Sequence, residues 1–178
     1  MRLRSYVLVT AGYWTFTLTD GALRMLVLLH FHDLGYSPAS LALLFLLYEF
    51  MGIITNLVGG WIGARSGLNR TLSAGLSLQV VALAALTAHQ VGWQEWVSVA
   101  FVMGIQALSG IAKDLTKLSS KSAVKLVAGE GALFTLVAAL TGSKNALKGV
   151  GFFLGAALLA SFGYNEALWT MAAALVVV

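Results

Sequence analysis

Residues 141–155, TGSKNALKGVGFFLG, place two lysines inside an apolar run that extends over residues 133–162. Lys144 and Lys148 are four residues apart, so both lie on one face of a helix. A charged side chain at the centre of a bilayer costs about 2.5–3.5 kcal/mol on insertion scales, and it usually faces a bundle interior or a watery cavity. The stretch therefore predicts a membrane helix with one polar, functional face.

The composition places the whole chain among membrane proteins. Of its 178 residues, 59% are hydrophobic and 10% are charged, whereas a soluble domain carries about 25% charged residues. The chain has no cysteine, which excludes disulfides, thiolate metal sites and cysteine nucleophiles. The formal charge of +4 comes from residues beside or inside apolar runs, so nucleic acid is not an expected partner.

Six apolar runs approach the length of about 20 residues that a helix needs to cross a bilayer. The expected helices span residues 5–31, 39–61, 71–88, 96–118, 133–162 and 167–178. The connections are short, which favours antiparallel neighbours in an all-α bundle. The last run covers about 18 Å at 1.5 Å per residue, so we expect that the chain is cut inside its sixth helix.

Basic residues mark one side of this predicted bundle. They precede the first run, separate the second from the third and follow the fourth: Arg2, Arg4, Arg65, Arg70, Lys117, Lys121 and Lys125. The opposite loops contain neither lysine nor arginine, so the positive-inside rule places the N-terminus in the cytoplasm. Aromatic residues typical of an interfacial belt lie near the opposite ends of the runs: Tyr36, Trp93, Trp96 and Tyr164.

Charges inside the runs are confined to four of the six expected helices. They are Asp20, Arg24, Glu49, Lys113, Asp114, Lys144 and Lys148. Because the third and sixth runs carry none, the first and second helices correspond to the fourth and fifth. This placement predicts two three-helix units related as inverted repeats, a plan of transporters whose substrate sites lie near the midplane. Sequence identity between the two units is not visible.

The acids of the first two helices each allow two interpretations. Asp20 and Arg24 either form an intrahelical pair that lowers the cost of insertion, or Arg24 binds an oxyanion while Asp20 holds or releases it. Glu49 has no partner in its own helix. Because desolvation disfavours a charged carboxylate, it is a candidate proton carrier; the alternative is that it pairs with Arg24 or Lys113 across the bundle.

The fourth helix carries a polar stripe that comprises Gln106, Ser109, Lys113 and Lys117. We expect Gln106 and Lys113 to contribute to substrate binding, and we expect Lys117 and the later lysines to extend to the inner interface. Asp114 is a further candidate for proton coupling.

The fifth helix adds Asn145, which lies next to Lys144 and is a candidate polar ligand. Gly151 and Gly155 have the small-xxx-small spacing of helix packing.

No catalytic or metal-binding motif occurs in the chain. The phosphate-binding loop, the nucleophile elbow of hydrolases and the zinc-protease helix motif are all absent. His30, His32 and His89 lie at outer loop ends without partners close in sequence, and we expect them to be exposed. The sequence therefore predicts no enzyme, no cofactor and no metal site.

Residues 60–70, GWIGARSGLNR, form the expected cytoplasmic turn after the second helix. This turn resembles a motif of the major facilitator superfamily, with matches at Gly60, Arg65, Gly67 and Arg70. In that superfamily the motif acts as a conformational loop. Ala64 stands where the motif has an acidic residue, so the charge relay that normally involves this acid is in doubt.

Longer strings resemble the bacterial organoarsenical efflux permeases of this superfamily. They are YWTFTLTDGALRMLVLLHFHDLGYSP, LYEFMGIITNLVGGW, GLNRTLSAGL, QALSGIAKDL, KSAVKL and LTGSKNALKGVGFFLGA, which together cover nearly the whole chain. The resemblance implies about twelve helices, of which these are the first six, so that the C-terminal half is a partner. It also implies a multi-pass protein of the bacterial inner membrane that exports 1-arseno-3-phosphoglycerate and confers arsenate resistance. Glyceraldehyde-3-phosphate dehydrogenase would make this ester from arsenate in the cytoplasm.

The candidate residues and the resemblance agree on an anionic substrate. Hard oxyanions of pentavalent arsenic suit arginine and lysine rather than thiolates. The expected substrate ligands are Arg24, Gln106, Lys113, Lys144, Asn145 and Lys148, and the candidates for proton-coupled alternating access are Asp20, Glu49 and Asp114. The alternatives are an exporter or antiporter of another phosphorylated or anionic metabolite, an anion channel, a structural membrane subunit and a membrane enzyme.

Overall fold

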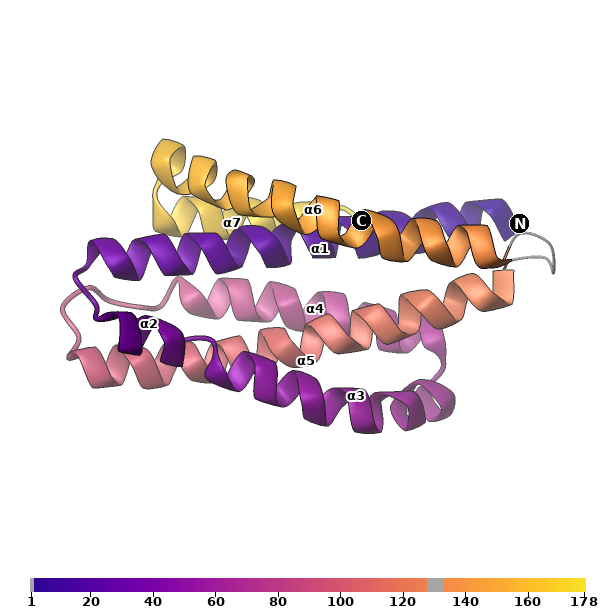
Figure 1. Ribbon diagram of the computed structural model, residues 1–178, viewed down its shortest axis with the longest axis horizontal. Coiled ribbons are helices and arrows are strands. Elements are labelled where there is room, and N and C mark those ends of the chain that lie inside the picture. The colour runs from indigo at the N-terminus through magenta and orange to yellow at the C-terminus, as the bar shows by residue number, and fades with distance from the viewer. Residues whose placement is uncertain (1, 128–132) are drawn as a thin grey trace.

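The computed structural model describes residues 2–127 and 133–178, with the side chains of residues 7–124 and 134–178. Every regular element in these residues is an α-helix (Figure 1). The helices are α1 Arg2–Asp33, α2 Pro38–Leu43, α3 Leu46–Ser66, α4 Leu68–Leu86, α5 Glu95–Val127, α6 Leu133–Phe162 and α7 Tyr164–Val176. The predicted all-α class is therefore confirmed.

Three helical stretches in the described residues are long and apolar enough to cross a membrane. They are Pro38–Ser66, Glu95–Val124 and Phe134–Phe162, and they correspond to the second, fourth and fifth expected runs. Helix α1 carries Asp20, Arg24 and several threonines in its middle section, and α7 is only 13 residues long. The chain therefore has the helices of a membrane protein, while six crossings stay a prediction.

The second expected helix is broken near its N-terminal end. Leu44 and Phe45 interrupt the run and separate α2 from α3. Ser37 caps α2, because its side-chain oxygen accepts a hydrogen bond of 3.2 Å from the backbone amide of Ser40. Pro38 occupies the first turn, where the missing amide proton costs nothing. Helix α2 is therefore a short separate helix before the longer helix α3.

Two consecutive helix pairs are each joined by a single glycine. Gly67 links α3 to α4 with a φ of +83°, and Gly163 links α6 to α7 with a φ of +86°. Other residues are strained at such positive φ values, so glycine lets the chain reverse within one residue. The helix pairs α3–α4 and α6–α7 are therefore hairpins of the same kind.

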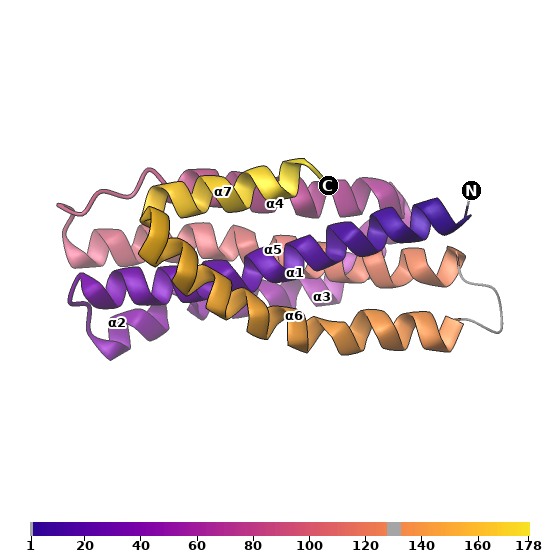
Figure 2. The ribbon, with the colours of Figure 1, turned by 90° about the horizontal axis from the view of Figure 1, so that it is seen from above.

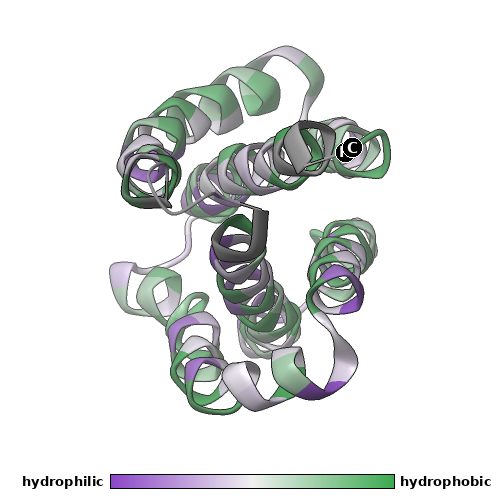
Figure 3. Ribbon diagram, turned by 90° about the vertical axis from the view of Figure 1, so that its right-hand side faces the viewer, coloured by the Kyte–Doolittle hydropathy of each residue, from purple (hydrophilic) through white to green (hydrophobic). Residues whose placement is uncertain are grey.

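The helices pack as an elongated bundle (Figures 1 and 2). Helix α1 lies along α6, and α5 lies along both α3 and α4. Helix α1 also contacts α5, and α4 contacts α7. Figure 3 looks along the bundle and shows hydrophobic residues on outward faces as well as between helices. Leu57 of α3 and Phe153 of α6 are about four-fifths exposed, which fits a surface that faces lipid.

Buried apolar side chains form one large cluster and a small one. The large cluster joins α1, α4 and α7 through residues such as Leu26, Leu83 and Leu168, each of which is fully buried or almost so. The small cluster consists of Tyr13, Leu140 and Val124, from α1, α6 and α5. The helices are therefore held by apolar contacts on both sides of a polar middle section.

Candidate functional site

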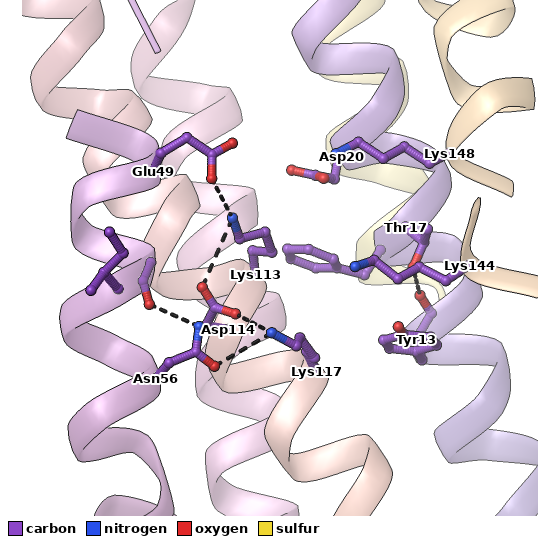
Figure 4. A pocket seen from close by; sticks show the side chains of 13 residues that line it. Tyr13, Thr17, Asp20, Glu49, Asn56, Lys113, Asp114, Lys117, Lys144 and Lys148 are labelled. Carbon is purple, nitrogen blue, oxygen red and sulfur yellow. Dashed lines mark hydrogen bonds and ion pairs between the residues drawn. The ribbon is translucent and has the colours of Figure 1, made fainter. Parts of the chain in front are cut away.

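A polar cavity of about 310 Å³ lies between the pair α1–α6 and the pair α3–α5 (Figure 4). Its lining consists of Tyr13, Phe16, Thr17, Asp20, Glu49, Gly52, Ile53, Asn56, Lys113, Asp114, Lys117, Lys144 and Lys148. Six of the nine side chains that the sequence singles out for binding or coupling are in this set: Asp20, Glu49, Lys113, Asp114, Lys144 and Lys148. The tertiary structure therefore gathers charges that are spread over 129 residues of the chain (148 − 20 + 1).

Close helix crossings set the two walls of this cavity. A Cβ atom at Gly21 of α1 would lie 2.6 Å from the carbonyl oxygen of Lys148 in α6. A Cβ atom at Gly110 of α5 would collide with the backbone of Tyr48 in α3. Both obstacles are backbone atoms that cannot swing away, so glycine is required for each approach. The crossings bring the charged residues of each wall to the same depth of the bundle.

Glu49 bridges two bases that lie on different helices. It forms an ion pair with Arg24 of α1, and its Oε2 lies 3.4 Å from Nζ of Lys113 in α5. Glu49 therefore pairs with Arg24 and Lys113 across the bundle, as one of its two interpretations predicted, and its role as a proton carrier stays a prediction. Its side chain is also 58% exposed, so burial does not isolate it.

Asp114 pairs with the two α5 lysines that line the cavity. Its side chain is 1% exposed, with Oδ1 at 3.1 Å from Nζ of Lys117 and Oδ2 at 3.9 Å from Nζ of Lys113. Lys117 also donates a hydrogen bond of 3.4 Å to Oδ1 of Asn56. The prediction that Lys117 extends to the inner interface is wrong, because it lines the cavity. Its i,i+4 spacing from Lys113 was the signal that could have identified it.

Asp20 and Arg24 do not form the intrahelical pair that was one interpretation of their spacing. Asp20 is 4% exposed and accepts a hydrogen bond from the hydroxyl of Tyr48, while Arg24 pairs with Glu49. Arg24 does not line the polar cavity. It lines a neighbouring apolar groove of about 530 Å³. Its link to the cavity is the ion pair with Glu49, which is part of the cavity lining.

The two lysines of α6 differ from those of α5. Lys144 and Lys148 line the cavity from the opposite wall (Figure 4), and neither forms a hydrogen bond or ion pair with a side chain in the described ranges. Lys148 is in electrostatic range of Asp20 and of other bases. With Arg24 included, five bases and three acids surround the cavity, a formal charge of 5 − 3 = +2. The unmatched charge lies on α6.

Two expected ligands lie outside the cavity. Gln106 is completely buried in the bundle, and its side-chain amide has no hydrogen-bond partner among the residues described. Asn145 is exposed on α6, because one residue along a helix turns the side chain by about 100° away from Lys144. Ser109, on the same stripe as Gln106, donates a hydrogen bond of 2.7 Å to Gln79 of α4. The N-terminal part of the stripe therefore packs against α4 at Ser109.

The residues that match the superfamily turn motif lie away from the cavity. Gly60 and Arg65 belong to α3, Gly67 is the turn residue, and Arg70 is in the first turn of α4. The guanidinium of Arg65 packs over the ring of Trp61 at 5.3 Å. These positions form the turn between two helices, and a role in conformational change stays a prediction.

Two of the three histidines are less exposed than expected. His89 is 8% exposed, its Nε2 lies 3.0 Å from Oγ of Ser98, and burial lowers the pKa of its imidazole. His30 stacks on Tyr164 with 3.9 Å between ring centroids. Only His32 is exposed, as predicted for all three. Within the described residues, no group of three or more histidines and acids could hold a metal ion.

The cavity can bind a small polar ligand with more negative than positive charge. Its four lysines supply hydrogen-bond donors from two facing walls, and its acids already serve the bases of α1 and α5. No protein-family model matches this chain, and comparisons with curated proteins and with solved structures also found no match.

Proposed function

We propose that this chain forms the N-terminal half of a secondary transporter that exports an anionic organoarsenical from the cytoplasm. The observation that carries the proposal is the pair Lys144 and Lys148, which line a polar cavity without a counter-ion among the described side chains. A desolvated cation without a partner is costly in a membrane. An anionic substrate would supply the missing negative charge, and its binding would offset the cost of the unpaired cations.

The proposed substrate is 1-arseno-3-phosphoglycerate, and the resemblance to organoarsenical permeases is the reason for this choice. Its phosphate and arsenate groups are both oxyanions, which hydrogen-bond well to ammonium and guanidinium groups. The side chains of Lys144 and Lys148 leave the helix about 6 Å apart, a spacing that suits two oxyanions at the ends of a three-carbon chain. The lack of cysteine argues against trivalent arsenic, which prefers soft thiolates.

Several correspondences support two inverted three-helix repeats, as in a major facilitator half. Helix α1 crosses α6 at Gly21, and α5 crosses α3 at Gly110. The residues around these two glycines are also similar, because Asp20-Gly21 with Arg24 matches Ser109-Gly110 with Lys113. The hairpins α3–α4 and α6–α7 each turn on one glycine with positive φ. Such repeats can rock around a midplane site during alternating access.

Glu49 is the best placed of the three acids for proton coupling. It is the most exposed of them and pairs with Arg24 and Lys113. An anionic substrate that bound these bases would displace the carboxylate, and a displaced carboxylate takes up a proton more readily. Substrate occupancy and the protonation state of Glu49 would then be linked, which is the requirement for coupling transport to the proton gradient. Asp20 and Asp114 remain candidates for the same role.

The test is neutralisation of the α6 lysines in the chromosomal gene. We expect Lys144→Gln and Lys148→Gln to reduce both growth on arsenate and uptake of the arseno-ester by inverted membrane vesicles at least ten-fold. The ester is made in situ by glyceraldehyde-3-phosphate dehydrogenase with arsenate. Lys121→Gln is the matched control, because it removes the same charge from α5 outside the cavity lining. Unchanged resistance and uptake in both α6 variants would falsify the proposal.

A second substrate class fits the same charges. The described cavity has lysines and acids but no feature that is specific for arsenic, so another phosphorylated metabolite is the alternative. Vesicle uptake of the arseno-ester in competition with a panel of organophosphates distinguishes the two. An anion channel would instead carry current that does not depend on a pH gradient.

A further inference from the structure

Tyr48 connects three of the helices around the cavity, although it is not part of the cavity lining. Its side chain is completely buried on α3. Its hydroxyl donates a hydrogen bond to Oδ1 of Asp20 in α1. Its backbone is pressed against Gly110 of α5. The sequence pattern did not single out this residue, because a tyrosine next to an acid in an apolar run carries no spacing signal.

The ring of Tyr48 is held in place by two cations. The guanidinium of Arg24 lies 4.1 Å from the ring centroid, and Nζ of Lys113 lies 4.2 Å from it. Both distances are within the range of favourable cation–π contacts. Glu49 in turn binds both cations, so it keeps them over the ring. With its ring and backbone both constrained, Tyr48 holds its hydroxyl against the carboxylate of Asp20.

Of the three acids that line the cavity, Asp20 is the one that interacts electrostatically with a lysine of α6. It lies at the same level of the cavity as Lys148 (Figure 4), and the two groups interact electrostatically. No ion pair joins them in the structure as described, and Oδ1 of Asp20 accepts a hydrogen bond from Tyr48 instead. A carboxylate released from that hydrogen bond would be able to pair with the ammonium group of Lys148, which has no ion pair among the described side chains.

We propose that Tyr48 is a positioning residue that holds Asp20 away from Lys148, so that the ammonium group of Lys148 stays available to an anionic ligand. This inference rests on the proposed function, in which Lys148 binds substrate. Lys148 can be neutralised either by the carboxylate of Asp20 or by the ligand, and the two compete. The hydroxyl of Tyr48 decides the competition in favour of the ligand.

The test is equilibrium binding of 2,3-bisphosphoglycerate, a stable three-carbon acid with two phosphate groups, to the protein purified from its native gene and placed in nanodiscs. Calorimetry gives the dissociation constant at pH 7. We expect Tyr48→Phe to weaken binding about ten-fold, the size of one charge-assisted contact. Tyr48→Phe keeps the ring between its two cations, so it removes only the hydrogen bond.

Two double variants separate positioning from a general structural effect. Adding Asp20→Asn to Tyr48→Phe removes the competing carboxylate, and we expect binding to return to the wild-type level or better. Lys148→Gln is expected to weaken binding about ten-fold in the wild-type protein but less than two-fold in the Tyr48→Phe background, where that lysine is already neutralised. Restored binding in the first double variant cannot come from restored folding, because the hydrogen bond is still missing.

Three results would overturn the inference. Unchanged affinity in Tyr48→Phe shows that the hydroxyl does not affect the ligand site. Additive losses for Tyr48→Phe and Lys148→Gln show that the effect does not pass through Lys148. If the wild-type protein does not bind the probe, or if Lys148→Gln alone has no effect, the inference fails together with the proposed function. These two measurements do not involve a change at Tyr48, so they separate a failure of the proposed function from a failure of the inference alone.

Discussion

Helices α5 and α6 each present two lysines four residues apart to the same cavity, and the two pairs have different surroundings. Lys113 and Lys117 of α5 are bound by carboxylates, above all by Asp114. Lys144 and Lys148 of α6 face them without an ion pair among the described side chains. Identical spacing therefore predicts the face of a helix on which the charges lie, but it does not predict whether they are satisfied.

The difference arises from the residues next to each pair. Helix α5 carries its own acid between the two lysines, and α3 brings a second acid, Glu49, to Lys113. Helix α6 has no acid in any of its 30 residues. The α5 pair therefore belongs to a network of ion pairs. The α6 pair has no ion pair among the described side chains, and under the proposed function it is available to an anionic ligand.

The largest expected effect on stability is removal of Asp114. In Asp114→Ala the two α5 lysines lose their shared carboxylate, and a broken buried pair costs about 3–5 kcal/mol. Unfolding by denaturant in detergent micelles, followed by tryptophan fluorescence, measures this change. Asp114→Asn is the control, because it keeps an oxygen for Lys117 and should lose less. If Asp114→Ala is as stable as the wild type, the α5 lysines are not held by this acid.

The crossing of α1 and α6, which positions the α6 lysines, gives the next effect. A Cβ atom at Gly151 would lie 2.5 Å from the carbonyl oxygen of Leu18, whereas one at Gly149 has no atom within 4 Å. We expect Gly151→Ala to destabilise the protein by about 1–3 kcal/mol, as overpacking does, and Gly149→Ala to have little effect. The same unfolding measurement compares them. Equal stability of the two variants would mean that the helices do not cross at Gly151.

A smaller loss is expected for Lys113→Gln. This change removes the ion pair with Glu49 and the contact of the ammonium group with the ring of Tyr48. We expect a loss of about 1–2 kcal/mol, because the side chain is 20% exposed and part of the interaction is screened. Raising the salt concentration should reduce the difference between the variant and the wild type. A salt-independent difference would point to packing instead of charge.

The smallest effect on stability is expected for Lys148→Gln. No ion pair is lost within the described structure, and a poorly solvated charge is removed, so stability should stay within about 0.5 kcal/mol or rise slightly. Binding of an anion should nevertheless fall about ten-fold. Measuring unfolding and calorimetric binding on the same sample tests both statements. A destabilisation as large as that of Lys113→Gln would remove the contrast between the two helices.

The helical class and most candidate residues could be predicted because both depend on local pattern. Long apolar runs predict helices, and charges inside such runs must face a polar interior. Ion partners could not be predicted in the same way. Glu49 looked isolated because its partners are 25 and 64 residues away. Lys117 looked like an interfacial lysine because its place near a helix end favours that interpretation until the facing wall is known.

Tyr48 and the repeated glycine crossings depend even more on three-dimensional contacts. Nothing in the residues beside Tyr48 indicates that two cations and an acid meet there. The similarity between the segments around Gly21 and Gly110 is too short to notice without knowing that each glycine marks a helix crossing. A common geometric role is what makes such a short match informative.

By itself, the sequence determined that the chain is helical and apolar, and that α6 carries two charges at a depth where charges are costly. These properties follow from side-chain hydropathy and helical periodicity, which act over neighbouring residues. Only the tertiary structure decided which charges are neutralised, because electrostatic partners are chosen by distance in space. The stretch TGSKNALKGVGFFLG contributes both lysines and the glycine that packs α6 on α1. The side chains that the structure describes on the facing helices do not supply a counter-ion to those lysines.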